Sequence, residues 1–146
     1  MTSAFWDSSG FVKLLIEEPG RDIAVEMWNE ADRNIASRLA VPEVSAAIAT
    51  ARRFGRLDGT SEREVRRRWA RNVEVIEFVE LLARVGADAA DLAAEHELSG
   101  ADSVHLASAL TLREMDLAVV TWDRRLAAAA AGEGLPVVPR DFSRRK

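Results

Sequence analysis

Four acidic residues occur in sequence contexts that would bring them to one edge of a parallel sheet: Asp7, Glu43, Asp102 and Asp123. Asp7 and Asp123 each follow a short apolar run, and Glu43 and Asp102 each lie in the expected first turn of a helix. Strand ends and helix starts share one rim of such a sheet, where ligands bind. Four carboxylates in one crevice repel one another unless a cation lies among them. Oxygen ligands favour Mg²⁺ or Mn²⁺, so the pattern predicts a metal-dependent phosphoryl-transfer site.

Each of these acidic residues also has a purely structural interpretation. Asp7 and Asp123 would cap the helices that follow their strands. Asp102 lies three residues after Ser99, close to capping-box spacing, and a glutamate such as Glu43 is common in a first turn. Taken singly, capping is the better interpretation of each residue. Taken together, their shared contexts favour a metal cluster.

The composition is that of a single globular domain over residues 1–146. Apolar residues make up 48% of the chain, enough for a substantial core. The absence of cysteine excludes disulfides and thiolate metal sites. With no signal-peptide pattern and no membrane-spanning apolar stretch, we expect a cytoplasmic protein. The net charge of −4 argues against general nucleic-acid coating but leaves room for local basic patches.

The elements that must position these residues alternate along the chain. Short apolar runs predict strands at 3–6, 34–37, 75–78 and 117–121, with an edge strand at 137–138 between two prolines. Helical periodicity occupies the intervals between them. We expect one helix to open with a capping box at Ser61 and Glu64, and another to cover 80–98 with Gly86 as a candidate break. The predicted fold is a three-layer α/β/α sandwich around a mostly parallel sheet.

Four segments carry a family pattern in the expected order: residues 5–9, 39–47, 98–109 and 120–126. With these segments the chain resembles the PIN-domain ribonucleases, and within them the VapC-type toxins of bacterial toxin–antitoxin modules. The resemblance covers essentially the whole chain. It implies a PIN-like fold and a ribonuclease that cleaves RNA phosphodiester bonds with Mg²⁺ or Mn²⁺. It also implies a cognate antitoxin and a homodimer.

The resemblance further implies that all four acidic residues form the metal-binding cluster. Asp7 and Asp102 match the most direct ligands, and Glu43 and Asp123 either position metal-bound waters or bind a second ion. Whether one or two ions bind stays open. A hydroxyl two places after the first aspartate is usual in the family, and Ser9 supplies it.

Other residues have weaker functional interpretations. Thr121 matches a family position that often helps to orient the site. His105 lies one helical turn from Asp102, and a locally hydrogen-bonded residue is a better interpretation than a catalytic one. For most of the four tryptophans, packing in the core or at an interface is a better explanation than base stacking. The basic cluster between Arg52 and Arg71 is either a solvated helix face or a phosphate-contacting rim. An antitoxin groove near Val65, Trp69, Val73 and Phe54 is a further hypothesis.

Two other functions compete with a ribonuclease. One is a different Mg²⁺-dependent phosphoryl-transfer enzyme, but a phosphatase with an aspartyl nucleophile would want a second aspartate where Ser9 stands. The other is a PIN-fold binding module without catalysis, which the intact acidic quartet argues against. No glycine-rich phosphate loop supports nucleotide binding.

Overall fold

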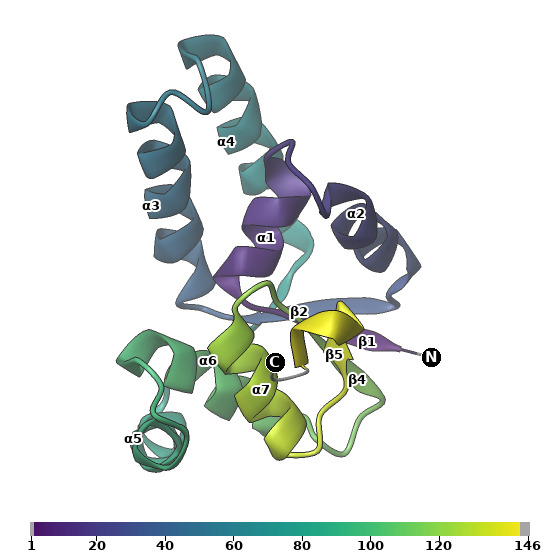
Figure 1. The fold of residues 1–146 in the computed structure, drawn as a ribbon, viewed down its shortest axis with the longest axis vertical. Coiled ribbons are helices and arrows are strands. Elements are labelled where there is room, and N and C mark those ends of the chain that lie inside the picture. The colour runs from purple at the N-terminus through teal and green to yellow at the C-terminus, as the bar shows by residue number, and fades with distance from the viewer. Residues whose placement is uncertain (1, 144–146) are drawn as a thin grey trace.

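The protein is described by a computed structural model over residues 2–143 (Figure 1). Five strands form one sheet in the order β3-β2-β1-β4-β5, and every pair is parallel. The strands are β1 (Ser3–Trp6), β2 (Arg33–Ser37), β3 (Glu77–Val79), β4 (Leu117–Val120) and β5 (Val137–Val138). The chain builds outward from β1 to β3 and then returns to place β4 on the other side of β1. The topological switch point therefore lies between β1 and β4, where open α/β sheets bind ligands.

Helices cover both faces of the sheet. One face carries α1 (Ser8–Leu15), α2 (Arg21–Glu30), α3 (Ala40–Arg53) and α4 (Gly59–Val75). The other carries α5 (Ala83–His96), α6 (Gly100–Leu110) and α7 (Arg124–Gly132), and a 3₁₀ turn η1 (Arg140–Ser143) follows β5. This is the expected three-layer sandwich, with a sheet that is parallel throughout the described residues. No helix among these residues is long and apolar enough to cross a membrane.

Strand β1 supplies both hydrophobic cores because its side chains alternate between the two faces. Ala4 and Trp6 belong to the core beneath α1–α4, whereas Phe5 belongs to the core beneath α5–α7. Trp6 is fully buried and stacks on Phe11 with ring centroids 5.4 Å apart. Burying an aromatic side chain of this size stabilises the fold by roughly 2–3 kcal/mol. After Ser3 this central strand is apolar up to its end at Trp6, so the first polar residue that follows it marks the rim.

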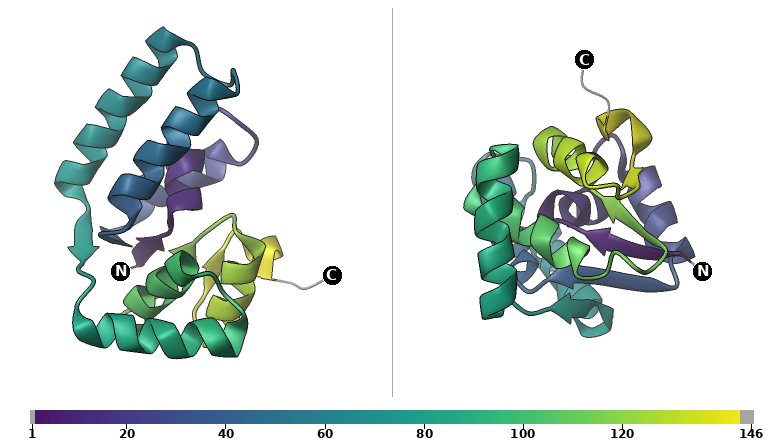
Figure 2. Two further views of the ribbon diagram at one scale, coloured as in Figure 1. Left: turned by 90° about the vertical axis from the view of Figure 1, so that its left-hand side faces the viewer. Right: turned by 90° about the horizontal axis from the view of Figure 1, so that it is seen from below.

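Helices α3 and α4 form a hairpin that projects beyond the sheet (Figures 1 and 2). The stripe formed by Val65, Trp69 and Val73 packs into the core of the first face. This stripe is therefore not itself an open groove, and of the residues named for an antitoxin groove only the Phe54 region remains exposed. Phe54, at the end of α3, is 76% exposed. The interpretation of the tryptophans as packing residues is confirmed, since all four are buried or packed against this core.

Several element boundaries differ from the sequence-based expectation. Helix α4 begins at Gly59, because Asp58 rather than Ser61 caps it: the Asp58 carboxylate accepts from the Ser61 N–H at 2.7 Å. Gly86 lies inside α5 and does not break it. Strand β3 covers 77–79 rather than 75–78, because α4 continues to Val75. These shifts do not move the elements that carry the acidic quartet.

Candidate active site

Two members of the quartet lie at the switch point of the sheet. Asp7 directly follows β1, and Asp123 follows the neighbouring strand β4 by a two-residue link. The strands run in register with Trp6 beside Val120, so their carboxyl ends coincide. Both carboxylates also cap helices: Asp7 accepts from the Gly10 N–H at 2.9 Å, and Asp123 accepts from the Leu126 N–H at 3.0 Å. The capping interpretation and the shared rim are thus both realised.

The Asp7 carboxylate is buried in a shell of hydroxyl groups. Thr121 donates to its Oδ2 at 2.6 Å, and Ser9 donates to its Oδ1 at 2.7 Å. Asp7 is only 3% exposed. Burial raises the pKa of Asp7 above its ordinary value, although the bonds from Thr121, Ser9 and Gly10 and the attraction of His105 oppose the rise. The hydroxyl and backbone donors only partly offset the cost of burying this carboxylate, so a cation at the rim would favour its ionised form.

Gly10 permits the close approach that places Asp7 at this point. A Cβ atom at Gly10 would lie 2.7 Å from the carbonyl oxygen of Val120 and 2.9 Å from the Trp6 ring. The Ser9 hydroxyl also accepts from the Trp122 N–H at 2.9 Å, and the Thr121 hydroxyl accepts from the Asp123 N–H at 3.0 Å. The loop after β4 is therefore fixed to the start of α1 by the same hydroxyls that hold Asp7.

Glu43 reaches the rim from the first turn of α3. Its Oε1 accepts from the Ser8 hydroxyl at 2.7 Å and lies 2.5 Å from Nε2 of His105. Burial alone would raise the pKa of Glu43, but the bonds from His105 and Ser8 hold it below its ordinary value. Nε2 of His105 donates to this carboxylate, and its Nδ1 has no hydrogen-bond partner among residues 2–143. His105 is 2% exposed, which confirms a locally bonded, buried residue.

Asp102 faces the rim from the first turn of α6. As predicted, Ser99 caps that helix: its hydroxyl accepts from the backbone N–H of Asp102 at 3.1 Å. The carboxylate is partly exposed. Burial, followed by repulsion from Asp123 and then from Glu43, raises the pKa of Asp102 despite the favourable effects of Ser99 and His105. This repulsion places Asp102, Asp123 and Glu43 within electrostatic reach of one another.

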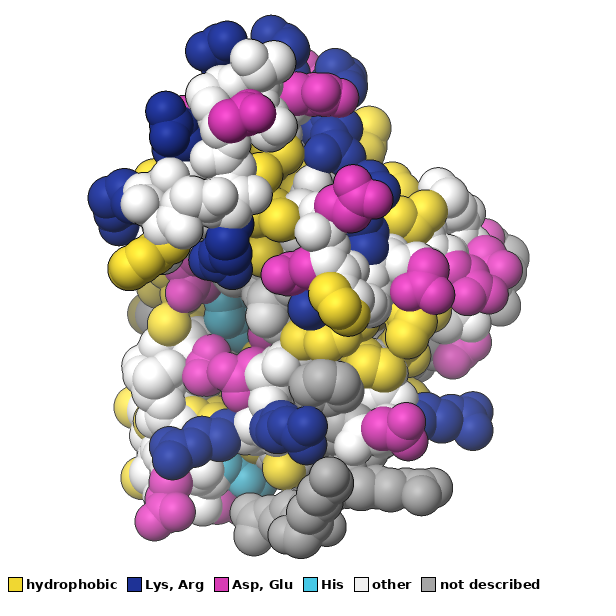
Figure 3. Space-filling view, turned by 45° about the horizontal axis from the view of Figure 1, so that its top comes forward, with side chains coloured by type: hydrophobic (Ala, Val, Ile, Leu, Met, Phe, Trp, Pro, Cys, Tyr) yellow, Lys and Arg dark blue, Asp and Glu magenta, His cyan; other side chains and the backbone are white. Residues whose placement is uncertain are grey.

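The quartet surrounds one region but leaves it open. Among residues 2–143, no three ligand atoms of the quartet lie within 4.8 Å of one another. A hard divalent ion fits such a spacing, because Mg²⁺ keeps several waters and takes only one or two carboxylates directly. The remaining carboxylates then bond to its waters. Figure 3 shows acidic side chains around a hollow below the hairpin, with Lys and Arg side chains around the hairpin tip.

The basic cluster on α3 and α4 is divided between internal and exposed side chains. Arg68 donates to the carbonyl oxygen of Leu15 at 2.7 Å, and Arg66 donates to Ser45 at 3.1 Å. Arg67 and Arg71 are exposed, with no hydrogen bond or ion pair among the described residues. Only part of the cluster is therefore available to a phosphate.

Two functional contributions were missed by the sequence analysis, namely Ser8 as a partner of Glu43 and Gly10 as the point of close approach. Gly10 carries a recognisable signal, since a glycine in the first turn after a buried strand often marks close backbone packing. Ser8 carries none, because its role depends on a contact 35 residues away in the chain.

Comparisons with known proteins agree on one family. The sequence profile of the PIN domain matches residues 4–132. Two curated relatives from Mycobacterium tuberculosis, ribonuclease VapC45 and ribonuclease VapC49, are each 42% identical over 139 residues, which cover 95% of this chain and 96% of theirs. A chain in a solved toxin–antitoxin complex from Klebsiella pneumoniae is similar with a TM-score of 0.65 at 20% identity, covering 94% of this chain and 97% of that one.

Proposed function

The chain belongs to the PIN domain family, and from this premise we propose that it is a divalent-metal-dependent ribonuclease of the VapC type, the toxin of a toxin–antitoxin module. The two relatives at 42% identity over nearly their full length carry the ribonuclease assignment. Within the molecule, the observation that carries it is the position of Asp7 and Asp123 at the switch point, with Glu43 and Asp102 directed to the same rim.

The four acidic residues divide into two pairs in this proposal. Asp7 and Asp102 bind the ion directly, and Asp123 and Glu43 hold its waters. A bound Mg²⁺ or Mn²⁺ lowers the pKa of an attacking water and neutralises charge on the phosphate. The hydroxyls of Ser9 and Thr121 keep the Asp7 carboxylate in one orientation. His105 and Ser8 do the same for Glu43, leaving its Oε2 for a water.

The RNA would approach beneath the α3–α4 hairpin. The exposed guanidinium groups of Arg67 and Arg71 lie on α4, on the same side of the sheet as Glu43. Phosphate contacts of this kind position a strand without reading its sequence. The acidic rim itself would repel RNA, and the net charge of −4 gives the protein no general attraction for it. The exposed arginines on α4 would supply that attraction locally.

The proposal is tested by replacing a ligand that neither caps a helix through its side chain nor lies in the core. Asp102→Asn should lower divalent-dependent RNA cleavage by about 1000-fold or more, since the ion supplies several kcal/mol of barrier reduction. Asp88→Asn, an exposed substitution of the same kind on α5, should cleave as the parent does. Cleavage of a mixed RNA substrate with Mg²⁺, Mn²⁺ or EDTA measures both. Full activity in Asp102→Asn, or in EDTA, would refute the assignment.

The same assay separates the competing functions. A phosphatase of the aspartyl type should hydrolyse a small phosphomonoester, which the ribonuclease should leave intact. Ser9 supports the nuclease here, because its hydroxyl is already bonded to both oxygens of Asp7 and supplies no second carboxylate. A binding module without catalysis would bind RNA but show no divalent-dependent cleavage.

A protein partner follows from the same family assignment. We expect a cognate antitoxin, and co-expression with the neighbouring reading frame should relieve growth inhibition by this chain. A homodimer is also proposed, because the exposed apolar side chains Val75, Leu81 and Leu82 occur within eight consecutive residues. Leu82→Asp should then shift the mass measured by light scattering from dimer to monomer, and an unchanged mass would exclude this surface.

A further inference from the structure

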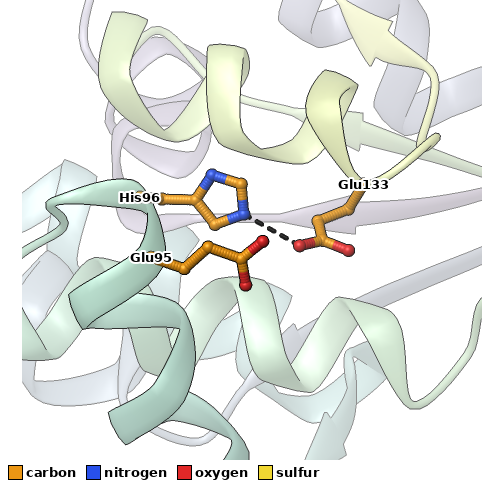
Figure 4. Close-up of side chains that lie close together, drawn as sticks. All are labelled: Glu95, His96 and Glu133. Carbon is orange, nitrogen blue, oxygen red and sulfur yellow. Dashed lines mark hydrogen bonds and ion pairs between the residues drawn. The ribbon is translucent and has the colours of Figure 1, made fainter.

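A second group of potential metal ligands lies at the opposite end of α7 from Asp123 and the acidic rim. Glu95 and His96 end helix α5, and Glu133 directly follows α7. Each supplies one ligand atom, and these atoms all lie within 4.8 Å of one another, a property that no other group among residues 2–143 shares. In Figure 4 the three side chains point toward one another from two helix ends, with Nε2 of His96 facing Glu133. We propose that this cluster binds a divalent transition metal of the Zn²⁺ class.

The donor set distinguishes this site from the acidic rim. One imidazole nitrogen with two carboxylate oxygens suits borderline ions such as Zn²⁺, whereas oxygen atoms alone suit Mg²⁺. Asp123 and Glu133 flank α7 at opposite ends, about 15 Å apart at 1.5 Å per residue. An ion at the α5–α7 end is therefore separate from any ion held by the quartet.

The existing contact needs only a small adjustment to admit an ion. Nε2 of His96 lies 2.8 Å from Oε1 of Glu133. Across a tetrahedral Zn²⁺, a nitrogen and an oxygen ligand are about 3.4 Å apart. The distance between these two atoms would have to increase by about 0.6 Å, which a change of glutamate rotamer can supply. Both atoms could then bind the same ion. Glu95 is exposed and makes no hydrogen bond or ion pair among the described residues, so its carboxylate is available as the third ligand.

The surrounding electrostatics also favour a cation. Two helices end at the cluster, α5 at His96 and α7 at Gly132, and each C-terminus carries a partial negative charge. A solvent-open cleft of about 620 Å³ adjoins it, and the acidic residues Asp88 and Asp91 line its wall together with Glu95 and Glu133. The cleft gives an ion an entry path on which the local charge attracts it.

Two arginines, Arg84 and Arg113, also line this cleft, and Arg113 lies beside the cluster itself. Arg113 places its guanidinium 3.8 Å from Oε2 of Glu133, while its own side chain is 49% exposed. An ion pair this long and this exposed contributes little. It also involves the oxygen that faces away from His96, so Oε1 remains for the metal.

Such an ion would join the C-terminal ends of α5 and α7, two helices that are connected to residues of the acidic rim. The turn of residues 97–99 after His96 leads into α6, whose first turn holds Asp102. Helix α7 begins at Asp123. Bound metal would therefore stabilise the folded chain, by an amount that grows with the logarithm of its free concentration once that concentration exceeds the dissociation constant.

The chain holds two histidines, which makes the site directly visible by NMR. During titration of the full chain with Zn²⁺, the ¹⁵N–¹H imidazole signals of His96 should shift and saturate at one equivalent. Isothermal calorimetry should detect the same event, and the thermal midpoint should rise. His96→Gln and Glu95→Gln should weaken that binding at least tenfold. Glu95→Gln removes no intramolecular bond of the described chain, so it tests the site without disturbing the fold.

Two controls separate this site from others. Glu114→Gln, an exposed substitution of the same kind, should bind Zn²⁺ as the parent does. Asp102→Asn should also retain the His96 shift, because that variant alters only the acidic rim. Zn²⁺ that leaves the His96 signal in place, or that binds Glu95→Gln and the parent equally, would overturn the proposal. A shift that is lost in Asp102→Asn would transfer the binding to the rim and overturn it as well.

Discussion

The two ends of helix α7 carry opposite arrangements of the same kinds of side chain. At its N-terminal end, Asp123 caps the helix at a rim where Asp7 is 3% exposed and bonded to hydroxyls on both oxygens. At its C-terminal end, Glu133 meets His96 and the exposed Glu95. Hydrogen bonds hold Asp7 and Asp123 in place without a ligand. The three side chains at the C-terminal end would have to move slightly to coordinate an ion.

The helix dipoles explain why the two ends differ. N-termini supply N–H donors that stabilise carboxylates as anions, so the rim can concentrate four acidic residues. The same dipoles repel a cation, which makes the full set of carboxylates necessary to hold it. C-termini attract a cation directly, so two carboxylates and an imidazole are enough there. We therefore expect single-atom changes to disturb the folded structure more at the rim than at the opposite end of α7.

The largest effect should come from Asp7→Asn. The substitution removes the buried charge but keeps a good helix cap, since asparagine caps as well as aspartate. We expect RNA cleavage to fall by about 1000-fold or more while the protein stays folded. Asp58→Asn, at the exposed cap of α4, changes the same atoms without touching the rim and should cleave normally. Cleavage rates with circular dichroism spectra measure both, and an active Asp7→Asn variant would remove the rim from the mechanism.

A smaller effect is expected where the rim is held in place by neighbours. His105→Ala should cost about 2–4 kcal/mol of unfolding free energy, because it leaves a cavity and breaks the bond to Glu43. Cleavage should fall by roughly 10–100-fold, as for other groups that orient a ligand. Ser8→Ala removes the other bond to the same oxygen and should cost only about 1 kcal/mol. Urea denaturation and cleavage assays test this order, and a His105→Ala variant with normal cleavage would make His105 purely structural.

The acidic residues of the rim were easier to predict from the sequence than the contacts that hold them in place. The four acidic residues could be found because strand ends and helix starts converge by a general rule of parallel sheets. The contact between Glu43 and His105 joins residues 62 apart, and no local pattern specifies it. His96 and Glu133 are 37 residues apart and lie in no motif, so their proximity also emerged only from the packing of α5 and α7 against α6.

The predicted helix boundaries were wrong for a different reason. The Ser61–Glu64 spacing suggested a helix start, but Asp58 offered a cap three residues earlier and the helix extended to it. Gly86 costs about 1 kcal/mol inside a helix, and burial of Val85 and Ala89 offsets that cost. Tertiary packing overrode both local signals.

In the metal-free protein, the rim carboxylates Asp7 and Glu43 should change the free energy of unfolding with pH in opposite directions. The raised pKa of Asp7 means that its contribution to stability is complete below the ordinary value of 3.8 and is lost as the pH rises through the folded-state pKa. The stability of Asp7→Asn relative to the parent should therefore increase over that rise, by about 1.4 kcal/mol for each unit of pKa difference.

Glu43 should behave in the opposite way. Because folding lowers its pKa, the Glu43 carboxylate stabilises the protein at pH values above its ordinary pKa of 4.5. That contribution is lost as the pH falls through the folded-state pKa. Glu43→Gln should be less stable than the parent at neutral pH and approach it in acid. Denaturation in EDTA across pH 3–8 measures both differences; equal slopes for the two variants would contradict the opposite environments assigned to these carboxylates.

The smallest expected effect is on the salt dependence of RNA binding, which tests whether RNA binds beneath the hairpin or near the C-terminal end of α7. If RNA lies beneath the hairpin, each exposed arginine that contacts a phosphate contributes about 0.7 to the slope of log affinity against log salt for a single strand. Arg67→Ala and Arg71→Ala together should then lower the slope by about 1.4 in binding assays with the inactive Asp7→Asn background. Arg84→Ala, an exposed arginine beside the cleft at the α5–α7 end, should leave the slope unchanged. The reverse result would place RNA against the end of α7 that we assign to a transition metal, and the functional division between its two ends would not hold.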